Sequence, residues 1–296
     1  MPGAEDRIRR LLRAGEALTR PALARRAGVS TVMAGRIMAR LVARGEAEET
    51  GRVPSGGGRP VMQYRVAANY GRLAHFRVER AGHVLRGGVV LTDMRGEPLQ
   101  RSREMSFAML QAESLDDWLD ANARRGGGAP LRGITLSLPE TLPPCGLEEH
   151  LHHRYGCPVR RINAALALAM LETRDDTLVL YLPRGGAPQG AHRRRGGTTP
   201  CGQLHLLPTQ VPWEDMDYAD ATLVVETVSR LVMLLTCTLS PRRVALYADF
   251  WSAKLTSRIR YNCSAKLERC TAPPSLHFRP LPEEGMEAIL ARTAAR

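Results

Sequence analysis

The sequence predicts an α/β protein in which a small arginine-rich unit, residues 1–66, precedes a larger domain of alternating strands and helices, residues 70–296. Glycines and prolines divide the first unit into three short helical patterns and a glycine-rich turn. Beyond residue 70, short apolar runs alternate with helical patterns, which favours a largely parallel sheet.

Composition and charge indicate a folded protein with a polyanionic partner. The 296 residues are 44% hydrophobic and 24% charged, which is typical of a folded chain and excludes a disordered or collagen-like one. The net charge is +12, and residues 1–65 hold 13 arginines against 6 acidic residues. A polyanionic partner is therefore expected. Scattered cysteines without CxxC spacing, and no apolar leader before the first helical pattern, indicate a cytoplasmic protein.

The first two helices are predicted from the spacing of apolar residues and from residues that begin or end helices. Ile8, Leu11 and Leu12 form one apolar stripe on a short helix over residues 5–14. Thr19 is a predicted N-cap, and the next helix ends at Gly28. Both helices are short, so they need a shared core.

A third helix follows a short turn. Ser30 is its predicted N-cap and Gly45 marks its end. The predicted buried face consists of Ala34, Ile37, Met38 and Leu41. Two short helices joined by a glycine-containing turn are typical of a helix-turn-helix, whose second helix enters the major groove of DNA. In that arrangement Thr31 and Arg36 would donate hydrogen bonds to bases, while Val32 and Met33 would contact thymine methyl groups.

Residues 46–66 predict a two-stranded hairpin whose tip spans residues 55–60. Glycines there allow close approach to a surface, and Arg59 is placed to enter a minor groove. The alternative is a flexible linker. Taken together the elements predict a winged helix-turn-helix, with these residues at the DNA surface: Arg20, Ser30, Thr31, Val32, Met33, Arg36, Arg40, Arg52, Gly57, Gly58 and Arg59.

The larger domain contains a series of predicted elements. Strands are expected at 73–78, 131–139, 159–162, 178–182 and 244–249, and helices at 146–155, 163–173, 221–239 and 286–294. Within the long apolar helix, Cys237 is expected to be inert core. The run His192–Arg195 is expected at a solvated hairpin tip, or in contact with phosphates of DNA or an anionic effector.

Several segments together resemble the ROK family (repressors, open reading frames, kinases), in its repressor branch. They are Leu18–Ser30, Arg36–Gly45, the hairpin tip Gly56–Pro60, Asn69–Gly71 and Gly87–Glu97. The resemblance is specific up to about residue 97 and then patchy but in order. It implies that the second domain is a two-lobed, actin-like (ribonuclease-H-type) α/β domain, which phosphorylates sugars in the kinases and binds them in the repressors.

The motifs that the family uses for phosphoryl transfer are missing. Ala164 stands where the resemblance places the catalytic aspartate, and a methyl group cannot accept a proton. The first phosphate motif is absent between Phe76 and Leu85, and Pro188 interrupts the second. Tyr247 begins the run that replaces the expected glycines after a late strand. The sequence therefore predicts a protein that is not an enzyme.

The metal and sugar ligands of the family are also depleted. The counterpart of the zinc motif has Gln203 in place of a glutamate, His205 one position early and no cysteine cluster downstream. We expect no metal and no cofactor. The residues that remain as possible effector ligands are Asn163, Gln203 and His205. A second histidine-rich run, His150–Cys157, favours a polar surface helix over a metal site.

The leading hypothesis is a bacterial, sequence-specific, DNA-binding transcriptional regulator of the ROK type, with repression the expected mode. Its C-terminal domain would serve for homodimer or higher homo-oligomer formation, with or without a small-molecule effector. The alternative is a non-catalytic module that binds a ligand or a protein and uses the winged unit for assembly. A residual sugar kinase is the third hypothesis.

Overall fold

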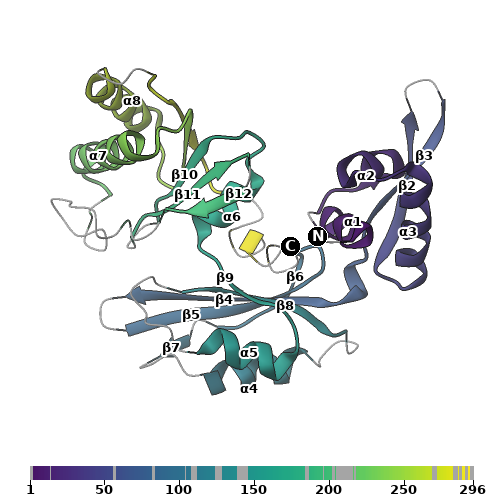
Figure 1. Ribbon diagram of the computed structural model, residues 1–296. Coiled ribbons are helices and arrows are strands. Elements are labelled where there is room, and N and C mark those ends of the chain that lie inside the picture. The colour runs from purple at the N-terminus through teal and green to yellow at the C-terminus, as the bar shows by residue number, and fades with distance from the viewer. Residues whose placement is uncertain are drawn as a thin grey trace.

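A computed structural model gives the arrangement of the chain (Figure 1). The residues that it describes are 3–13, 15–55, 58–81, 84–103, 105–107, 112–123, 129–138, 146–183, 187–195, 197–201, 204, 216, 218–268, 272–282, 286, 289, 290 and 293.

The N-terminal segment, residues 3–66, contains three helices and a small antiparallel sheet. The elements are α1 (Ala4–Arg13), β1 (Leu18–Thr19), α2 (Arg20–Ala27), α3 (Thr31–Ala43), β2 (Ala47–Ser55) and β3 (Gly58–Val66). The strand order is β1-β3-β2. This is the order of elements predicted for a winged helix-turn-helix.

Capping residues set the ends of the helices in the N-terminal segment, and one hydrophobic core holds the helices together. The Thr19 side chain accepts a hydrogen bond from the Ala22 amide, and Gly28 ends α2 at a φ of 64°, which favours glycine. The predicted face of α3 is confirmed: Ala34, Ile37, Met38 and Leu41 are all buried. They pack with residues of α1, α2 and the sheet, so the three short helices stabilise one another.

The first lobe is a mixed six-stranded sheet with two helices on one face (Figure 1). Its strands are β4 (Arg72–Ala81), β5 (Val84–Asp93), β6 (Pro98–Arg101), β7 (Met105–Phe107), β8 (Leu131–Ser137) and β9 (Val159–Arg161), and its helices are α4 (Ala112–Ala123) and α5 (Leu147–Tyr155). A short 3-10 helix, η1 (Ala68–Tyr70), joins β3 to β4.

The second lobe is a five-stranded sheet with helices on both faces. Its elements are α6 (Ala164–Leu171), β10 (Thr177–Tyr181), β11 (Gln189–Arg194), β12 (Gly197–Pro200), α7 (Ala221–Leu239), β13 (Arg243–Tyr247), α8 (Ala253–Leu267) and β14 (Ser275–Arg279). One core lies between the sheet, α7 and α8, and another between the sheet and α6. Helical residues near the end of the chain, Met286, Ile289 and Leu290, complete the second core.

Three expectations need correction. The sheets are mixed and not largely parallel, because β4–β5 and β10–β11 are antiparallel pairs of strands that follow one another directly in the chain. Cys237 is exposed, because α7 covers the sheet with only one of its faces. In the run expected at a hairpin tip, Arg194 and Arg195 are exposed, but His192 is buried and lies 3.0 Å from the Asp176 carboxylate.

Helix α7 is long and apolar enough to cross a membrane by length and composition. Half of its most apolar window is buried inside the protein, where Val224, Val228 and Val232 pack against the sheet and α8. This burial is typical of a core helix of a folded domain.

Candidate nucleic-acid interface

The first turn of α3 presents apolar side chains to solvent. The Ser30 hydroxyl accepts a hydrogen bond from the Met33 amide at 3.1 Å, which sets the direction in which the helix begins. Val32 is 68% exposed and Met33 is 48% exposed, and Thr31 is exposed beside them. Large exposed apolar side chains in adjacent positions indicate a contact surface.

One stripe runs along the centre of the outer face of α3. At 100° per residue, Val32, Arg36 and Ala39 lie opposite the buried face, and all three are exposed. Within the described part of the chain, Arg36 makes no hydrogen bond or ion pair. Ala39 was not among the residues predicted for the interface, although the helical spacing contained the signal. Its small side chain leaves room for close approach of another molecule.

Arg20 lies across α3 at Gly35. Its Nη2 donates a hydrogen bond to the Tyr64 hydroxyl at 3.1 Å, which joins α2 to β3. A Cβ at position 35 would lie 3.3 Å from Cδ of Arg20. This close packing explains a glycine in the interior of a helix, where it costs about 1 kcal/mol relative to alanine. Arg20 is thereby positioned on the surface between α2, α3 and the hairpin.

Arg40 does not extend freely from α3. Its Nη2 lies 2.9 Å from Oε2 of Glu5 in α1, and Nη2 of Arg44 lies 2.5 Å from Oε1 of the same carboxylate. Hydrogen bonds from Arg44 and Arg40 lower the pKa of Glu5 to about 2. This pairing was not predicted, because α1 and α3 meet only in the folded chain.

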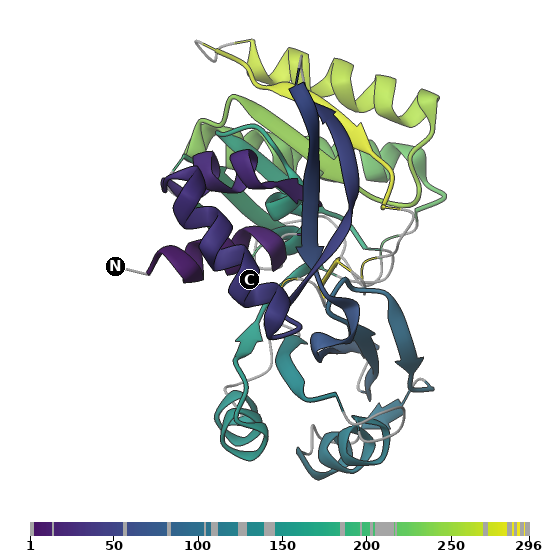
Figure 2. The same ribbon diagram turned by 90° about the vertical axis from the view of Figure 1, so that its right-hand side faces the viewer.

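The hairpin extends beside α3 at the outer side of the molecule (Figures 1 and 2). Strands β2 and β3 pair from Ala47 opposite Val66 to Ser55 opposite Gly58. Arg52 is exposed on β2. Gly58 begins β3, whereas Gly57 and the side chain of Arg59 lie outside the described part of the chain. The structure therefore brings the helical residues predicted for the interface and Arg52 together on one segment.

The residues predicted for an effector lie elsewhere. Asn163 is the N-cap of α6, and its Oδ1 accepts a hydrogen bond from the Leu166 amide at 2.7 Å. Its predicted neighbours Gln203 and His205 lie outside the described residues. The amide of Ala164 donates to Oε1 of Gln189 at 2.7 Å, and Ala164 itself is buried. Gln189, which was not among the residues predicted for the site, thus covers the start of α6.

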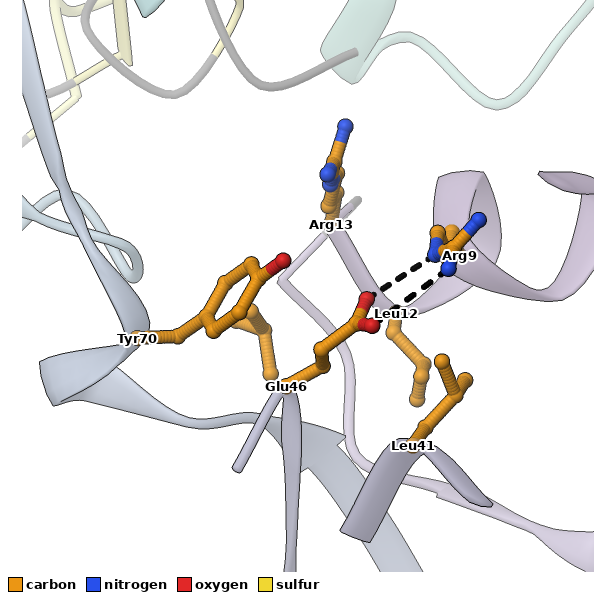
Figure 3. Close-up of a pocket in the computed structure, with 7 residues that line it drawn as sticks. Arg9, Leu12, Arg13, Leu41, Glu46 and Tyr70 are labelled. Carbon is orange, nitrogen blue, oxygen red and sulfur yellow. Dashed lines mark hydrogen bonds and ion pairs between the residues drawn. The ribbon is translucent and has the colours of Figure 1, made fainter. Parts of the chain in front are cut away.

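The N-terminal segment contacts the first lobe through both apolar and charged groups. Val66 packs with Leu73, Met94 and Tyr70, and Nε of Arg95 donates to the Val66 carbonyl at 3.3 Å. A small pocket lies at this junction (Figure 3), lined by Arg9, Leu12, Arg13, Leu41, Glu46, Val66 and Tyr70. Glu46 is buried there and accepts from Nε of Arg9 at 2.9 Å.

Comparisons with known proteins identify the fold. No family model matches the chain, and no curated protein matches it. A solved structure described as a ROK family transcriptional regulator, homologous to the E. coli MLC protein, is similar with a TM-score of 0.62 at 12% identity, over 98% of this chain and 95% of that chain.

Two sugar-kinase structures align with about three quarters of the chain. A glucokinase from Balamuthia mandrillaris, solved with glucose, gives a TM-score of 0.50 at 12% identity and covers 76% of this chain and 94% of that chain. A ROK hexokinase from Thermus thermophilus gives 0.47 at 15% identity, with 75% and 97% covered. The fold class predicted from the sequence is confirmed: the chain has the α/β fold of the ROK regulator structure.

Proposed function

We infer that the chain belongs to the ROK family, and we propose that it is a sequence-specific DNA-binding regulator of transcription, acting as a repressor. The observation that carries the proposal is the outer face of α3, where exposed Val32 and Met33 adjoin exposed Arg36. Such a mixed apolar and cationic surface on the second helix of a helix-turn-helix suits the base edges of a major groove.

In the proposed complex, the side chains of the N-terminal segment have different roles. Arg36 and Thr31 donate hydrogen bonds to bases, while Val32 and Met33 contact thymine methyl groups. Arg20 and Arg52 contact phosphates on either side of α3, and Arg40 joins them when it leaves Glu5. The tip of the hairpin, with Arg59, enters the adjacent minor groove.

The regulator would act as a homodimer on DNA in the bacterial cytoplasm. One recognition helix reads only a few base pairs, so two copies on paired half-sites are needed for useful specificity. The two lobes would carry the contacts between copies. We propose no zinc and no other cofactor for them.

The lobes are proposed to have no kinase activity. At the start of α6 the chain has buried Ala164 in place of a proton acceptor, and Oε1 of Gln189 accepts a hydrogen bond from the amide of Ala164. Phosphoryl transfer requires a group that positions and deprotonates the attacking hydroxyl, and alanine supplies none.

The proposal is tested by selecting bound sequences from a random double-stranded DNA library with the purified full-length chain at two salt concentrations. We expect an enriched motif with two half-sites, and an affinity that falls steeply as salt rises. A Val32→Glu variant is the control, since its exposed position tolerates the change in the fold while the added charge faces the groove. No enrichment with the unmodified chain would contradict the proposal and favour a role in assembly.

A further inference from the structure

Three arginines form a ridge along α3, and they differ in their partners. Arg36, Arg40 and Arg44 are each one turn apart, so their side chains follow one side of the helix. Arg36 has no partner within the described residues, whereas Arg40 and Arg44 share the carboxylate of Glu5. Nε of Arg44 also lies 2.8 Å from Oε1 of Glu46. Within the described part of the chain, the ridge that faces the proposed DNA therefore has an unpaired guanidinium group at Arg36 and guanidinium groups paired with carboxylates at Arg40 and Arg44.

Glu5 is held firmly in this position by α1. Its Oε1 also lies 2.7 Å from Nη2 of Arg9, whose Nε is bonded to buried Glu46. The Glu5 side chain is 24% exposed, while the side chains of Arg40 and Arg44 above it are 56% and 46% exposed. The carboxylate is thus partly covered by the two guanidinium groups, which themselves remain accessible from outside.

We propose that Glu5 occupies Arg40 and Arg44 in place of DNA phosphates and thereby limits the affinity of this protein for DNA. The inference rests on the proposed function and adds Arg44 to the proposed phosphate contacts. Carboxylate and phosphate oxygens are acceptors of the same kind for a guanidinium group. A duplex that reaches the end of the ridge must therefore displace Glu5 from the arginines or share them with it.

The competition has a measurable signature in salt dependence. Each phosphate contact releases condensed counterions and adds about 0.9 to the slope of log affinity against log salt. While Glu5 pairs with both arginines, and Glu46 pairs with Arg44 as well, Arg40 and Arg44 contribute less than two full phosphate contacts. Removal of the Glu5 charge should therefore steepen the slope as well as tighten binding.

Asp6 offers a matched control. It neighbours Glu5 on α1 and carries the same charge, but its carboxylate contacts Arg9 and the Gly3 amide, not the ridge. Glu5→Gln and Asp6→Asn remove equal charge from the same helix. A general electrostatic effect would change both variants alike, whereas competition for the ridge affects only Glu5→Gln.

The experiment measures fluorescence anisotropy of a labelled random-sequence duplex with the full-length chain, between 50 and roughly 200 mM salt, the range over which phosphate contacts are resolved. We expect Glu5→Gln to bind about tenfold more tightly at low salt, with a slope steeper by about 1, because Arg40 is released while Arg44 keeps Glu46 as a partner. Asp6→Asn should keep the original slope. Adding Arg40→Gln and Arg44→Gln to Glu5→Gln should abolish the increase in DNA affinity and the steeper salt slope.

Equal slopes for Glu5→Gln and Asp6→Asn would overturn the inference, as would weaker binding by Glu5→Gln with an unchanged melting temperature. The melting temperatures of Glu5→Gln and Asp6→Asn are measured beside the titrations, so that the slopes compared belong to folded chains. Failure of the unmodified chain to bind any duplex would overturn the proposed function and this inference together. Binding with equal slopes would overturn this inference alone.

Discussion

Helices α3 and α6 begin in the same way but present their first turns to different surroundings. Each is capped by a side chain, Ser30 in one case and Asn163 in the other. The first turn of α3 is exposed, with Val32 and Met33 in solvent. In the first turn of α6, by contrast, Ala164 and Ala165 are buried. Oε1 of Gln189 accepts a hydrogen bond from the amide of Ala164.

The difference shows which of the two helix starts has side chains accessible from outside. A helix start is a natural site for an anion or a polar ligand, because its amides lack partners in the helix. At α6 the chain itself supplies those partners. At α3 the amides are also capped, but the side chains of the first turn remain available for an external partner.

The largest expected effect is a loss of stability when a carboxylate is introduced at the start of α6, with the same change at the start of α3 as the comparison. Ala164→Asp should lower the free energy of unfolding by about 3 kcal/mol or more, since a carboxylate introduced at this buried position loses its hydration. The control, Thr31→Asp, lies at the same position of exposed α3 and should change stability by about 0.5 kcal/mol or less. Chemical unfolding of both variants provides the measurement.

The same pair also tests function. Ala164→Asp should show no sugar-dependent ADP release, because the phosphate motifs are absent as well. Thr31→Asp should lose DNA binding through repulsion of phosphates. A stable Ala164→Asp variant with kinase activity would show that the start of α6 is an open pocket, and the comparison would then be wrong.

A second effect involves His75, which lies between the first lobe and the end of the chain. Its Nδ1 is 2.8 Å from the Thr135 hydroxyl, which donates to the Leu290 carbonyl at 3.1 Å. Nδ1 therefore carries the proton, and Nε2 is a buried acceptor without a partner among the described residues. Protonation of Nε2 would bury an unsatisfied charged donor, and burial accordingly lowers the pKa of His75 to about 3, with repulsion from Arg77 in addition.

This pKa makes stability depend on pH. The unfolded chain binds a proton at His75 below about pH 6.5, whereas the folded chain does so only near pH 3. Stability should therefore fall as pH decreases, by about 3 kcal/mol between pH 7 and pH 4. Urea unfolding across this range should show a shallower pH slope for His75→Asn than for the unmodified chain. His153→Asn, the same substitution at an exposed position, is the control.

On the α3 side, Arg36→Ala should cost about 1 to 3 kcal/mol in binding to the selected DNA and relax its sequence preference. The reason is that Arg36 lies at the centre of the exposed stripe and its removal leaves no alternative donor there. Competition between selected and random duplexes measures the loss. Arg194→Ala, an equally exposed arginine of the second lobe, should bind DNA as the unmodified chain does; a similar loss in both variants would argue against this docking.

The smallest effect is expected for Gly35→Ala. The new Cβ would lie 3.3 Å from Cδ of Arg20, which is the flexible part of that side chain. The helix should gain about 0.5 kcal/mol, while Arg20 moves from Tyr64 and DNA binding weakens about twofold. The melting temperature measures the expected gain in stability, and a DNA titration measures the expected loss of affinity. Arg20→Ala should show the loss of binding without the gain in stability.

The sequence predicted local features well and long-range ones poorly. Ser30 as a cap, Gly28 as a stop and the buried face of α3 depend on neighbours within about one turn, and all were confirmed. Helix α8 was not predicted, although Leu255, Ile259 and Cys263 recur every four residues in its buried face. There the signal existed in the sequence but its charged neighbours obscured it.

Contacts between distant residues had no such signal. Gln189 meets Ala164 across 25 residues, and Glu5 meets Arg40 across 35. Whether an arginine is open or occupied depends on these contacts, so the sequence could place Arg36 and Arg40 on the same face but could not distinguish them. The fold was therefore more predictable than the state of its proposed interface.

The position of Met286, Ile289 and Leu290 has a consequence for biosynthesis. The Thr135 hydroxyl bonds to Leu290 across 155 residues, and Leu290 belongs to the core that surrounds α6. During translation the N-terminal segment has all its own core residues long before Leu290 leaves the ribosome. A nascent chain can therefore fold its α3 surface while the two lobes are still incomplete, and chaperones would be expected to meet the lobes and not the N-terminal segment.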